Sequence, residues 1–329
     1  MIKAGVVGYG TMGRVHSKAF QEMEGVRLIG VAEPDPQRRA QAEQDLGVDT
    51  FAGAQDLLGI EALDLVDICV PTYLHSAVFQ EALKARKHIF CEKPLARTWE
   101  EGEQILDLAR GYPGKIGIGH VVRFMPQYLG IRNSVLAGEI GQAAVVRTFR
   151  GGARFPRGWQ DWFSDFELSG GVILDLTIHD LDYLRWLFGE VERVYAKTTR
   201  ERSPARLEYA LIILRFKNGV IAHVEGSWAN YEGDFYTKVE IAGNRGLINY
   251  DSREANPLIR FSAENNSAAA VAVPENPALK SPYFLELEDM IKAIREDRPP
   301  AVSAAEALAS LKVALAAIKS AQTGQVITL

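Results

Sequence analysis

The sequence has few cysteines, no long apolar run and no excess of positive charge. Its two cysteines, Cys69 and Cys91, each end an apolar run, which is typical of buried reduced thiols rather than of a disulfide framework. No apolar run approaches the length of a membrane span, and the first five residues lead directly into a strand-like run that leaves no room for a signal peptide. The net charge is −5, so the charge favours neither nucleic acid nor an anionic membrane as a partner. We therefore expect a cytoplasmic protein without such partners.

A glycine-rich turn lies between the first strand-like run and the helix-like run that follows it. Gly8, Gly10 and Gly13 form a G-x-G-x-x-G pattern, and the second strand-like run ends at Glu33. Strand, glycines, helix, strand and acid at this spacing are typical of a dinucleotide site. Gly8 permits the tight turn, Gly10 lets the backbone approach the pyrophosphate, and Gly13 lets the helix pack closely. The free N–H groups of the helix N-terminus suit the phosphates.

The acidic residue also predicts which dinucleotide binds. Glu33 can accept hydrogen bonds from the adenosine ribose, and its charge repels the 2′-phosphate of NADP. Arg38 and Arg39 lie close in sequence and could offset part of that repulsion. We therefore predict NAD as the cofactor and consider NADP the weaker alternative.

The 329 residues suffice for two domains, and the pattern of elements changes once along the chain. Strand-like and helix-like runs alternate up to about residue 120, which predicts a parallel sheet. Thr98 and Glu101 form the pattern of a capping box before one of these helix-like runs. Strands dominate afterwards, including one predicted over 236–246, and Asn218-Gly219 predicts a tight hairpin. A loop or weak hairpin is expected around Asn265 to Ser267, and helices are expected at 125–137, 283–295 and 304–322. We predict an α/β protein with an N-terminal Rossmann doubly wound parallel sheet over residues 1–121. An α+β domain with a large open, mostly antiparallel sheet follows over 122–329, and the C-terminal helix is free to pack back on the first domain.

The stretch Cys91-Glu92-Lys93-Pro94 ends a predicted strand of the first domain. Pro94 cannot donate to a sheet ladder, so the strand stops there, at the edge where open α/β sheets bind ligands. The ammonium of Lys93 at this edge can hydrogen-bond a substrate oxygen and stabilise negative charge on it. A solvated ion pair at a surface strand end is the alternative interpretation.

A second candidate site lies in the segment from Ser169 to Gly189, which predicts a helix with a glycine-rich start. Asp175 and His179 are four residues apart and therefore share one helical face. A histidine beside a carboxylate can act as general base, because the carboxylate fixes its tautomer and supports the imidazolium. The spacing also suits half of a metal site, but we find no third ligand and predict no metal. A further alternative is that Asp175 and His179 form a helix-capping pair with a structural role.

The strand predicted over 206–216 is largely apolar on both of its faces. Helices of the same chain can cover one face. The other face needs a second cover, for which a partner subunit is the simplest candidate.

Together these motifs resemble the Gfo/Idh/MocA (glucose–fructose oxidoreductase / inositol dehydrogenase) family of NAD(P)-dependent oxidoreductases. The likeness covers essentially the whole chain and is carried by Gly8-x-Gly10-x-x-Gly13-x-x-His16, Glu92-Lys93-Pro94, Gly170-Gly171-x-x-x-Asp175-x-x-x-His179-Asp180-x-Asp182 and Ser320-Ala321-Gln322-Thr323-Gly324.

The resemblance implies that Lys93 binds the reacting oxygen and that His179 is the acid/base, with Asp175 as its polar partner. It implies sugars, sugar acids or cyclitols as substrates, and a homodimer or homotetramer formed through the second sheet. The implied cofactor contacts are Gly8, Tyr9, Gly10, Thr11, Met12, Gly13, Glu33, Pro71, Thr72, His75, Glu92 and Lys93. Three further residues lie near the domain junction or in a following loop and are expected either to contact substrate or to pack: Arg123, Arg154 and Trp162.

We therefore predict an NAD(H)-dependent dehydrogenase that oxidises a secondary hydroxyl of a sugar, polyol or cyclitol. A first alternative is an enzyme with a tightly held cofactor that performs sugar–sugar oxidoreduction or redox-assisted glycoside cleavage. A second alternative is a non-catalytic NAD(P)-binding regulator. The presence of Lys93, Asp175 and His179 disfavours the regulator.

Overall fold

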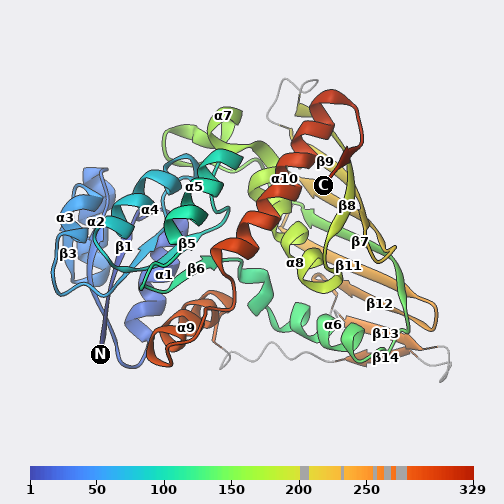
Figure 1. The fold of residues 1–329 in the computed structure, drawn as a ribbon, viewed down its shortest axis with the longest axis horizontal. Coiled ribbons are helices and arrows are strands. Elements are labelled where there is room, and N and C mark those ends of the chain that lie inside the picture. The colour runs from blue at the N-terminus through green and yellow to red at the C-terminus, as the bar shows by residue number, and fades with distance from the viewer. Residues whose placement is uncertain (201–206, 231–232, 255–257, 263–267, 272–279) are drawn as a thin grey trace. The chain divides into compact units, whose positions relative to one another are not determined.

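The computed structural model describes residues 1–200, 207–230, 233–254, 258–262, 268–271 and 280–329. The chain divides into two compact units. The first comprises residues 1–121, 158–162 and 280–311, and the second comprises residues 122–157, 163–279 and 312–329. Each unit is built on one sheet (Figure 1). Among the described residues, no helix combines the length and the apolar character that a bilayer span requires.

The first unit contains a six-stranded sheet with the order β3-β2-β1-β4-β5-β6, in which every neighbouring pair is parallel. Both neighbours of the central strand β1 follow it in sequence, so the strand order reverses there, and ligands bind at such a point. The strands are β1 (Ile2–Val7), β2 (Val26–Ala32), β3 (Asp49–Phe51), β4 (Leu65–Ile68), β5 (His88–Glu92) and β6 (Ile116–Gly119). The predicted Rossmann-type sheet is confirmed.

Local sequence signals set several helices of the first unit. Thr98 caps α5, and Glu101 returns a hydrogen bond to the cap, so the predicted capping box is confirmed. Asp35 caps α2, and Pro36 occupies its first turn. The helices are α1 (Thr11–Glu22), α2 (Pro36–Leu46), α3 (Ala54–Leu58), α4 (His75–Lys84), α5 (Trp99–Ala109) and α9 (Pro282–Arg295), with a 3-10 turn η1 (Thr72–Leu74). Although α9 is distant in sequence, it packs on α1 and contributes to the apolar core of this unit.

The second unit contains a nine-stranded sheet with the order β14-β13-β12-β11-β7-β10-β9-β8-β15. Among the described strand pairs, only β7 and β10 are parallel, so the predicted mostly antiparallel sheet is confirmed. The strands are β7 (Ala143–Gly151), β8 (Val191–Thr198), β9 (Tyr209–Phe216), β10 (Ile221–Ser227), β11 (Tyr236–Gly243), β12 (Gly246–Asp251), β13 (Leu258–Ser262), β14 (Ala268–Val271) and β15 (Ile327–Thr328).

Tight turns mark the ends of several of these strands. Gly219 has a φ of +93° in the Asn218-Gly219 turn between β9 and β10. The single strand predicted over 236–246 is wrong, because the chain reverses at Asn244-Arg245 and forms the pair β11 and β12. The predicted start of β9 at Arg206 and the loop or weak hairpin around Asn265 to Ser267 lie outside the described residues.

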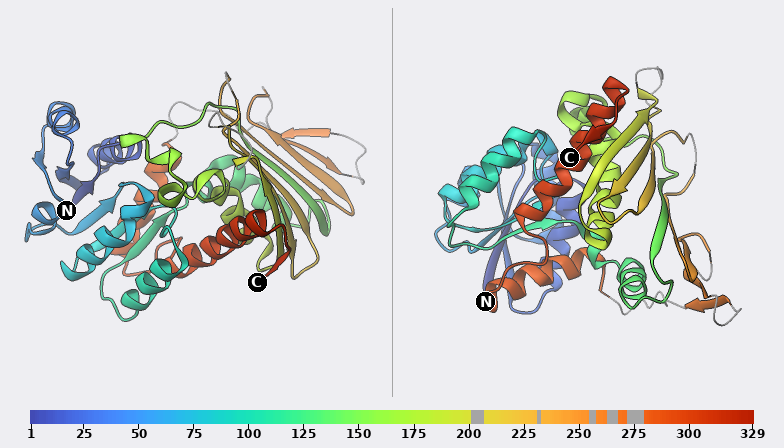
Figure 2. Two further views of the ribbon diagram at one scale, coloured as in Figure 1. Left: turned by 90° about the horizontal axis from the view of Figure 1, so that it is seen from above. Right: turned by 45° about the vertical axis from the view of Figure 1, so that its right-hand side comes forward.

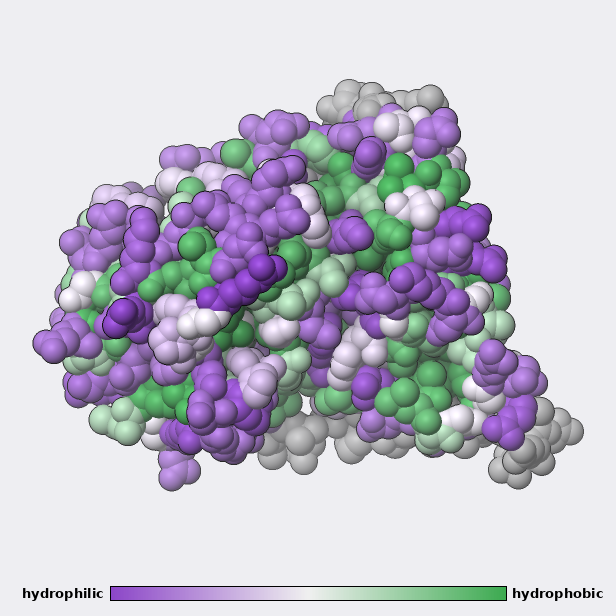
Figure 3. Space-filling view, in the orientation of Figure 1, coloured by the Kyte–Doolittle hydropathy of each residue, from purple (hydrophilic) through white to green (hydrophobic). Residues whose placement is uncertain are grey.

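One face of the nine-stranded sheet is packed, and Figure 2 shows helices along that face but none on the opposite one within the described part of the chain. On β9, Ala210, Ile212 and Leu214 are buried, whereas Leu211 and Ile213 on the opposite face are half-buried. Large exposed apolar side chains are scattered among polar ones, as Figure 3 shows for one side of the molecule.

The helix predicted over 169–189 is wrong as one continuous element. Gly170 and Gly171 have φ values of +69° and +66°, so α7 (Phe166–Ser169) ends there. A wider π-helical turn η4 (Ile173–Thr177) follows and leads into α8 (Ile178–Phe188). The other helical elements are η2 (Val121–Phe124), α6 (Pro126–Leu136), η3 (Trp159–Ser164) and α10 (Ala304–Thr323).

Two buried ion pairs fix α8 within the second unit. Arg150 of β7 donates from Nε to Oδ2 of Asp180 at 2.6 Å. Arg123 donates two hydrogen bonds to Asp182, at 2.8 and 2.7 Å. All four side chains are at most 3% exposed. The two aspartates of the motif around His179 therefore neutralise buried arginines.

Replacing Asp180 with Ala should destabilise the second unit, because Arg150 would stay buried without a counter-charge. We expect the free energy of unfolding to fall by about 3–5 kcal/mol. Arg147→Ala is the control on the same strand, since Arg147 is 57% exposed and its pair with Glu240 should contribute less than ~1 kcal/mol. Urea unfolding followed by circular dichroism measures both. A loss for Asp180→Ala as small as that of the control would contradict the prediction.

Candidate active site

The glycine-rich turn joins β1 to α1 at the centre of the first sheet. A Cβ atom on Gly8 would lie 2.6 Å from the carbonyl oxygen of Cys69, and one on Gly13 would lie 1.9 Å from the carbonyl oxygen of Gly8. Neither position accepts a side chain. Gly10, in contrast, has no atom within 4 Å of the place that a Cβ would take. The turn thus leaves open space at the N-terminus of α1, which fits the pyrophosphate of a dinucleotide.

Glu33 lies just beyond β2 and is only 4% exposed. Its carboxylate accepts hydrogen bonds from the backbone N–H of Tyr9 at 2.8 Å and of Asp35 at 3.0 Å, which hold it against the glycine-rich turn. A carboxylate offers about four acceptor positions, so capacity is left for ribose hydroxyls. Arg39 donates to the carbonyl oxygens of Glu33 and Pro34, so its guanidinium is engaged by the backbone.

His75 connects two turns at the carboxyl edge of the same sheet. It is 1% exposed, and its Nδ1 and Nε2 lie 2.7 and 3.0 Å from the carbonyl oxygens of Pro94 and Val70. Burial lowers the pKa of His75, although both carbonyls oppose that shift. The neutral imidazole therefore lies between the turn before Pro71 and the turn after β5, and its single N–H donates to one of the two carbonyl oxygens. Its contact with the cofactor stays a prediction.

Glu92 is the last residue of β5 and supports the backbone of Lys93. Its Oε2 accepts a hydrogen bond from the N–H of Lys93 at 3.0 Å, and its Oε1 lies 3.3 Å from Nε2 of His16. Burial raises the pKa of Glu92, but His16 and Lys93 outweigh burial and lower it overall. The carboxylate is thus ionised and directed inward, whereas Lys93 is half-buried at the strand end.

In the second unit, Asp175 and His179 lie on one side of η4 and α8. Within Gly171–Leu184, all of which the structure describes, these two are the only residues that are not buried. The π-helical turn that holds Asp175 therefore leaves the two predicted side chains on a common face. This arrangement suits a carboxylate that orients a histidine base.

The three residues proposed for substrate contact differ in their surroundings. Arg123 is paired with Asp182 and lies 5.4 Å from the centre of the Trp186 ring, which favours the packing role. Trp162 is 9% exposed, with its ring centre 6.3 Å from that of Tyr73. Arg154 is exposed. Substrate contact by Arg154 and Trp162 stays a prediction.

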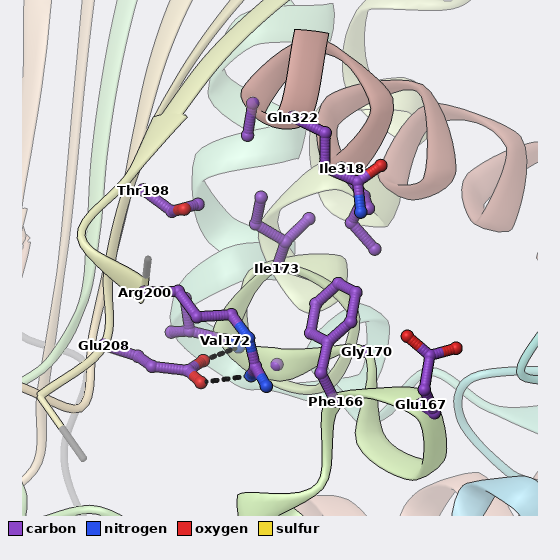
Figure 4. Close-up of a pocket in the computed structure, with 12 residues that line it drawn as sticks. Phe166, Glu167, Gly170, Val172, Ile173, Thr198, Arg200, Glu208, Ile318 and Gln322 are labelled. Atoms are coloured by element: carbon purple, nitrogen blue, oxygen red, sulfur yellow. Dashed lines mark hydrogen bonds and ion pairs between the residues drawn. The ribbon is translucent and has the colours of Figure 1, made fainter. Parts of the chain in front are cut away.

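A cavity of about 290 Å³ lies elsewhere in the second unit (Figure 4). Glu208 projects toward it and accepts hydrogen bonds from the N–H of Val172 at 2.9 Å and from Arg200 at 2.6 Å. The Arg200 guanidinium also lies 4.3 Å from the centre of the Phe166 ring. Because these polar groups bind one another, the cavity gives no support for a substrate site, and neither Asp175 nor His179 lines it.

Two buried acids of the first unit, Asp67 and Glu286, are not among the predicted site residues. Asp67 is a single charge within the apolar strand Leu65–Ile68, and Glu286 occupies a core-facing position of α9. A charged residue inside an apolar pattern is the signal that would have identified both, since such residues are rarely buried without a partner. Both lie close to His16.

The chain belongs to the Gfo/Idh/MocA family. Residues 2–120 match the model of an oxidoreductase family with an NAD-binding Rossmann fold, and residues 128–249 match the GFO/IDH/MocA C-terminal domain. The chain is thus an NAD(P)-dependent oxidoreductase, and both the family and the class of enzyme predicted from the motifs are confirmed.

The chain is similar to several known proteins along most of its length. It is 27% identical over 327 residues to myo-inositol 2-dehydrogenase of Thermotoga maritima, with 97% of this chain and 96% of that protein covered. It is 31% identical over 253 residues to inositol 2-dehydrogenase of Corynebacterium glutamicum, with 75% and 72% covered. Its fold matches levoglucosan dehydrogenase in complex with NADH and levoglucosan, with a TM-score of 0.89, 23% identity and 99% of each chain covered.

Gly10→Ala should weaken dinucleotide binding without harming the fold. The new Cβ meets no protein atom, but it occupies the space that fits the pyrophosphate. We expect the dissociation constant for NADH to rise at least tenfold, or about 1.4 kcal/mol, with the melting temperature of the free protein unchanged. Fluorescence titration and thermal unfolding measure the two quantities. Gly13→Ala is the comparison, since its Cβ would collide with the turn and lower the melting temperature. Unaltered NADH binding by Gly10→Ala would contradict the assignment.

Proposed function

We propose that this protein is an NAD-dependent dehydrogenase that oxidises a secondary hydroxyl of a sugar, polyol or cyclitol in the cytoplasm. One observation carries the proposal: Asp175 and His179 are the only residues of Gly171–Leu184 that are not buried. Support for the substrate class comes from relatives named inositol 2-dehydrogenase. Two free cysteines support a reducing compartment, although only Cys91 is buried and Cys69 is half-buried.

In this proposal Lys93 acts on the oxygen of the substrate hydroxyl and His179 acts on its proton. The Lys93 ammonium hydrogen-bonds the oxygen and stabilises the negative charge that develops on it, while Glu92 fixes the backbone from which the lysine projects. His179 removes the hydroxyl proton, and Asp175 orients the imidazole and stabilises its charged form. NAD, when bound, supplies the hydride acceptor.

NAD is the preferred cofactor in this proposal because Glu33 presents a carboxylate to the adenosine ribose. Arg39, one of the two arginines that could offset its charge, donates through Nη1 to the carbonyl oxygens of Glu33 and Pro34. It is therefore not available to a 2′-phosphate without losing those bonds.

A homodimer or homotetramer formed through the second sheet is also part of the proposal. The half-buried apolar side chains Leu211 and Ile213 of β9 lie on the sheet face that carries no described helix. Contact with a second copy of the chain would remove them from water.

The direct test measures NADH formation by absorbance with purified protein, a panel of inositols, aldoses and sugar acids, and either NAD or NADP. We expect turnover of at least one polyol or sugar, with NAD preferred. NADH binding without turnover of any member would favour the regulator, and faster turnover with NADP would overturn the cofactor assignment.

Lys93→Met should abolish turnover while NADH binding changes by less than roughly tenfold, because most dinucleotide contacts come from the glycine-rich turn and Glu33. Steady-state kinetics and NADH titration measure the two effects. Lys115→Met is the control, since Lys115 pairs with the exposed Asp297 and should leave kcat intact. A near-normal kcat for Lys93→Met would show that Lys93 has only a structural role.

His179→Asn should lower kcat by about 10²–10⁴, the usual contribution of general base catalysis. A base must be unprotonated, so the parent rate should rise with pH through one ionisation and then level off, and the variant should lose that step. Asp175→Asn should cost less, and the double variant little more than His179→Asn, because the residues act as a unit. His223→Asn on β10 is the control. A pH profile of kcat/KM that is unchanged in His179→Asn would mean that the proton leaves by another route.

A further inference from the structure

A buried polar cluster lies inside the first unit, directly behind the end of β5. It joins His16 of α1, Asp67 of β4, Glu92 of β5 and Glu286 of α9. Nδ1 of His16 lies 2.8 Å from Asp67, and its Nε2 lies 3.3 Å from Glu92 and 3.7 Å from Glu286. None of the four residues is more than 6% exposed. Three carboxyl groups thus surround one imidazole, out of contact with water.

The charges of this cluster do not balance if every carboxyl group is ionised. His16 offers one positive charge at most, and an uncompensated charge in the interior is costly. The thiol of Cys69 lies 3.4 Å from Nδ1 of His16, but burial raises its pKa, so it adds no negative charge. At least one carboxyl group must therefore hold a proton.

Glu286 is the group best suited to hold that proton. Glu92 accepts a backbone hydrogen bond from Lys93, and Asp67 is bonded to His16, so both are stabilised as anions. Neither oxygen of Glu286 has a hydrogen-bond partner among the described residues, and its neighbours on α9, Phe284 and Leu287, are in the apolar core. Burial, and then the charge of Glu92, raise the pKa of Glu286 well above its usual range, although His16 opposes this.

We propose that Glu286 is a positioning residue, held as a neutral carboxylic acid, that maintains His16 and Glu92 in the arrangement which fixes Lys93. The contacts run from Glu286 to His16, from His16 to Glu92, and from the Glu92 carboxylate to the N–H of Lys93. A neutral acid fills the space beside His16 without a second negative charge next to Glu92. The effect on turnover rests on the function proposed above for Lys93, whereas the protonation state does not.

Protonation of Glu286 has a defined effect on stability against pH. An unfolded glutamate ionises near 4.5, whereas folded Glu286 keeps its proton to higher pH. Its contribution to stability is therefore complete below pH 4.5 and is lost as the pH rises through the folded pKa. Between pH 4.5 and the folded pKa of Glu286, the unfolding constant should increase roughly tenfold per pH unit, because one proton is released on unfolding.

Glu286→Gln, which mimics the protonated acid, should remove this dependence. Relative to the parent, the variant should gain roughly tenfold in its folding constant per pH unit above 4.5. Glu288→Gln on the same helix is the control. Glu288 pairs with Lys280 and Lys292, which lower its pKa, so its substitution should cost stability at neutral pH and give no such gain. A pH-independent loss of about 10²-fold or more for Glu286→Gln would mean a broken ion pair and would overturn the proposal.

Infrared difference spectroscopy tests the protonation state directly. The parent should show the carbonyl band of a protonated carboxyl group at neutral pH, and Glu286→Gln should lack it. If the variant fails to fold, the parent spectrum decides alone, since absence of the band overturns the proposal. A stoichiometric metal found by elemental analysis of the purified protein would also overturn it, because His16, Glu92 and Glu286 lie close enough to share a cation.

The positioning role needs a readout that general destabilisation would not change. Glu286→Ala should lower kcat at least tenfold with the dissociation constant for NADH unchanged, and Glu286→Gln should restore kcat. The ¹³C resonance of reductively methylated Lys93, assigned with Lys93→Met, should shift in the Ala variant but not in the Gln variant. This second readout needs no turnover, so it separates failure of the positioning role from failure of the proposed function. Equal behaviour of the Ala and Gln variants would overturn the positioning role.

Discussion

The cost of burying charge governs how both units of this protein are assembled. In the second unit, Arg150 and Arg123 are paired with Asp180 and Asp182, so that α8 is fixed by two ion pairs that water does not reach. In the first unit, His16 lies among Asp67, Glu92 and Glu286. The charges of that cluster balance only if a carboxyl group, which we propose is Glu286, holds a proton. Removing one charged partner from either arrangement leaves a charge that the interior cannot solvate.

These buried charges lie beside the residues that carry the proposed chemistry. Glu92 immediately precedes Lys93, and Asp180 immediately follows His179. A rigid neighbour limits the motion of the next backbone atoms, and catalytic groups must be held within a few tenths of an ångström to be effective. The network below each site therefore provides the rigidity that the half-buried side chains at its surface require.

Local signals made much of the fold predictable from the sequence. The glycine-rich turn between β1 and α1, the capping box of Thr98 and Glu101, and the Asn218-Gly219 turn each act over a few residues, and the structure forms each of them. The same locality identified Asp175 and His179 as a pair, and their shared exposure agrees with that prediction although their helix begins with a π-helical turn.

Features that depend on distant residues were not predictable in this way. The left-handed Gly171 lies against Glu208, since a Cβ there would approach that carboxylate to 2.7 Å. Arg123 was a candidate for substrate contact until its pairing with Asp182 was known. Glu286 joins the cluster around His16 only because α9 returns to pack on α1. Such pairings are properties of the folded chain, and no periodicity within one segment encodes them.

The motif around His179 combines two kinds of residue that spacing alone does not separate. Asp180 and Asp182 are buried counter-charges, whereas Asp175 and His179 emerge at the surface of their segment. A protein that kept this fold only to bind a dinucleotide would need the first kind, because stability depends on them, and could lose the second. The same division applies at β5, where Glu92 is buried and Lys93 is half-buried. Under the proposed mechanism, the half-buried members, Lys93, Asp175 and His179, are the residues that would distinguish an enzyme from a regulator on this fold, and this chain has all three.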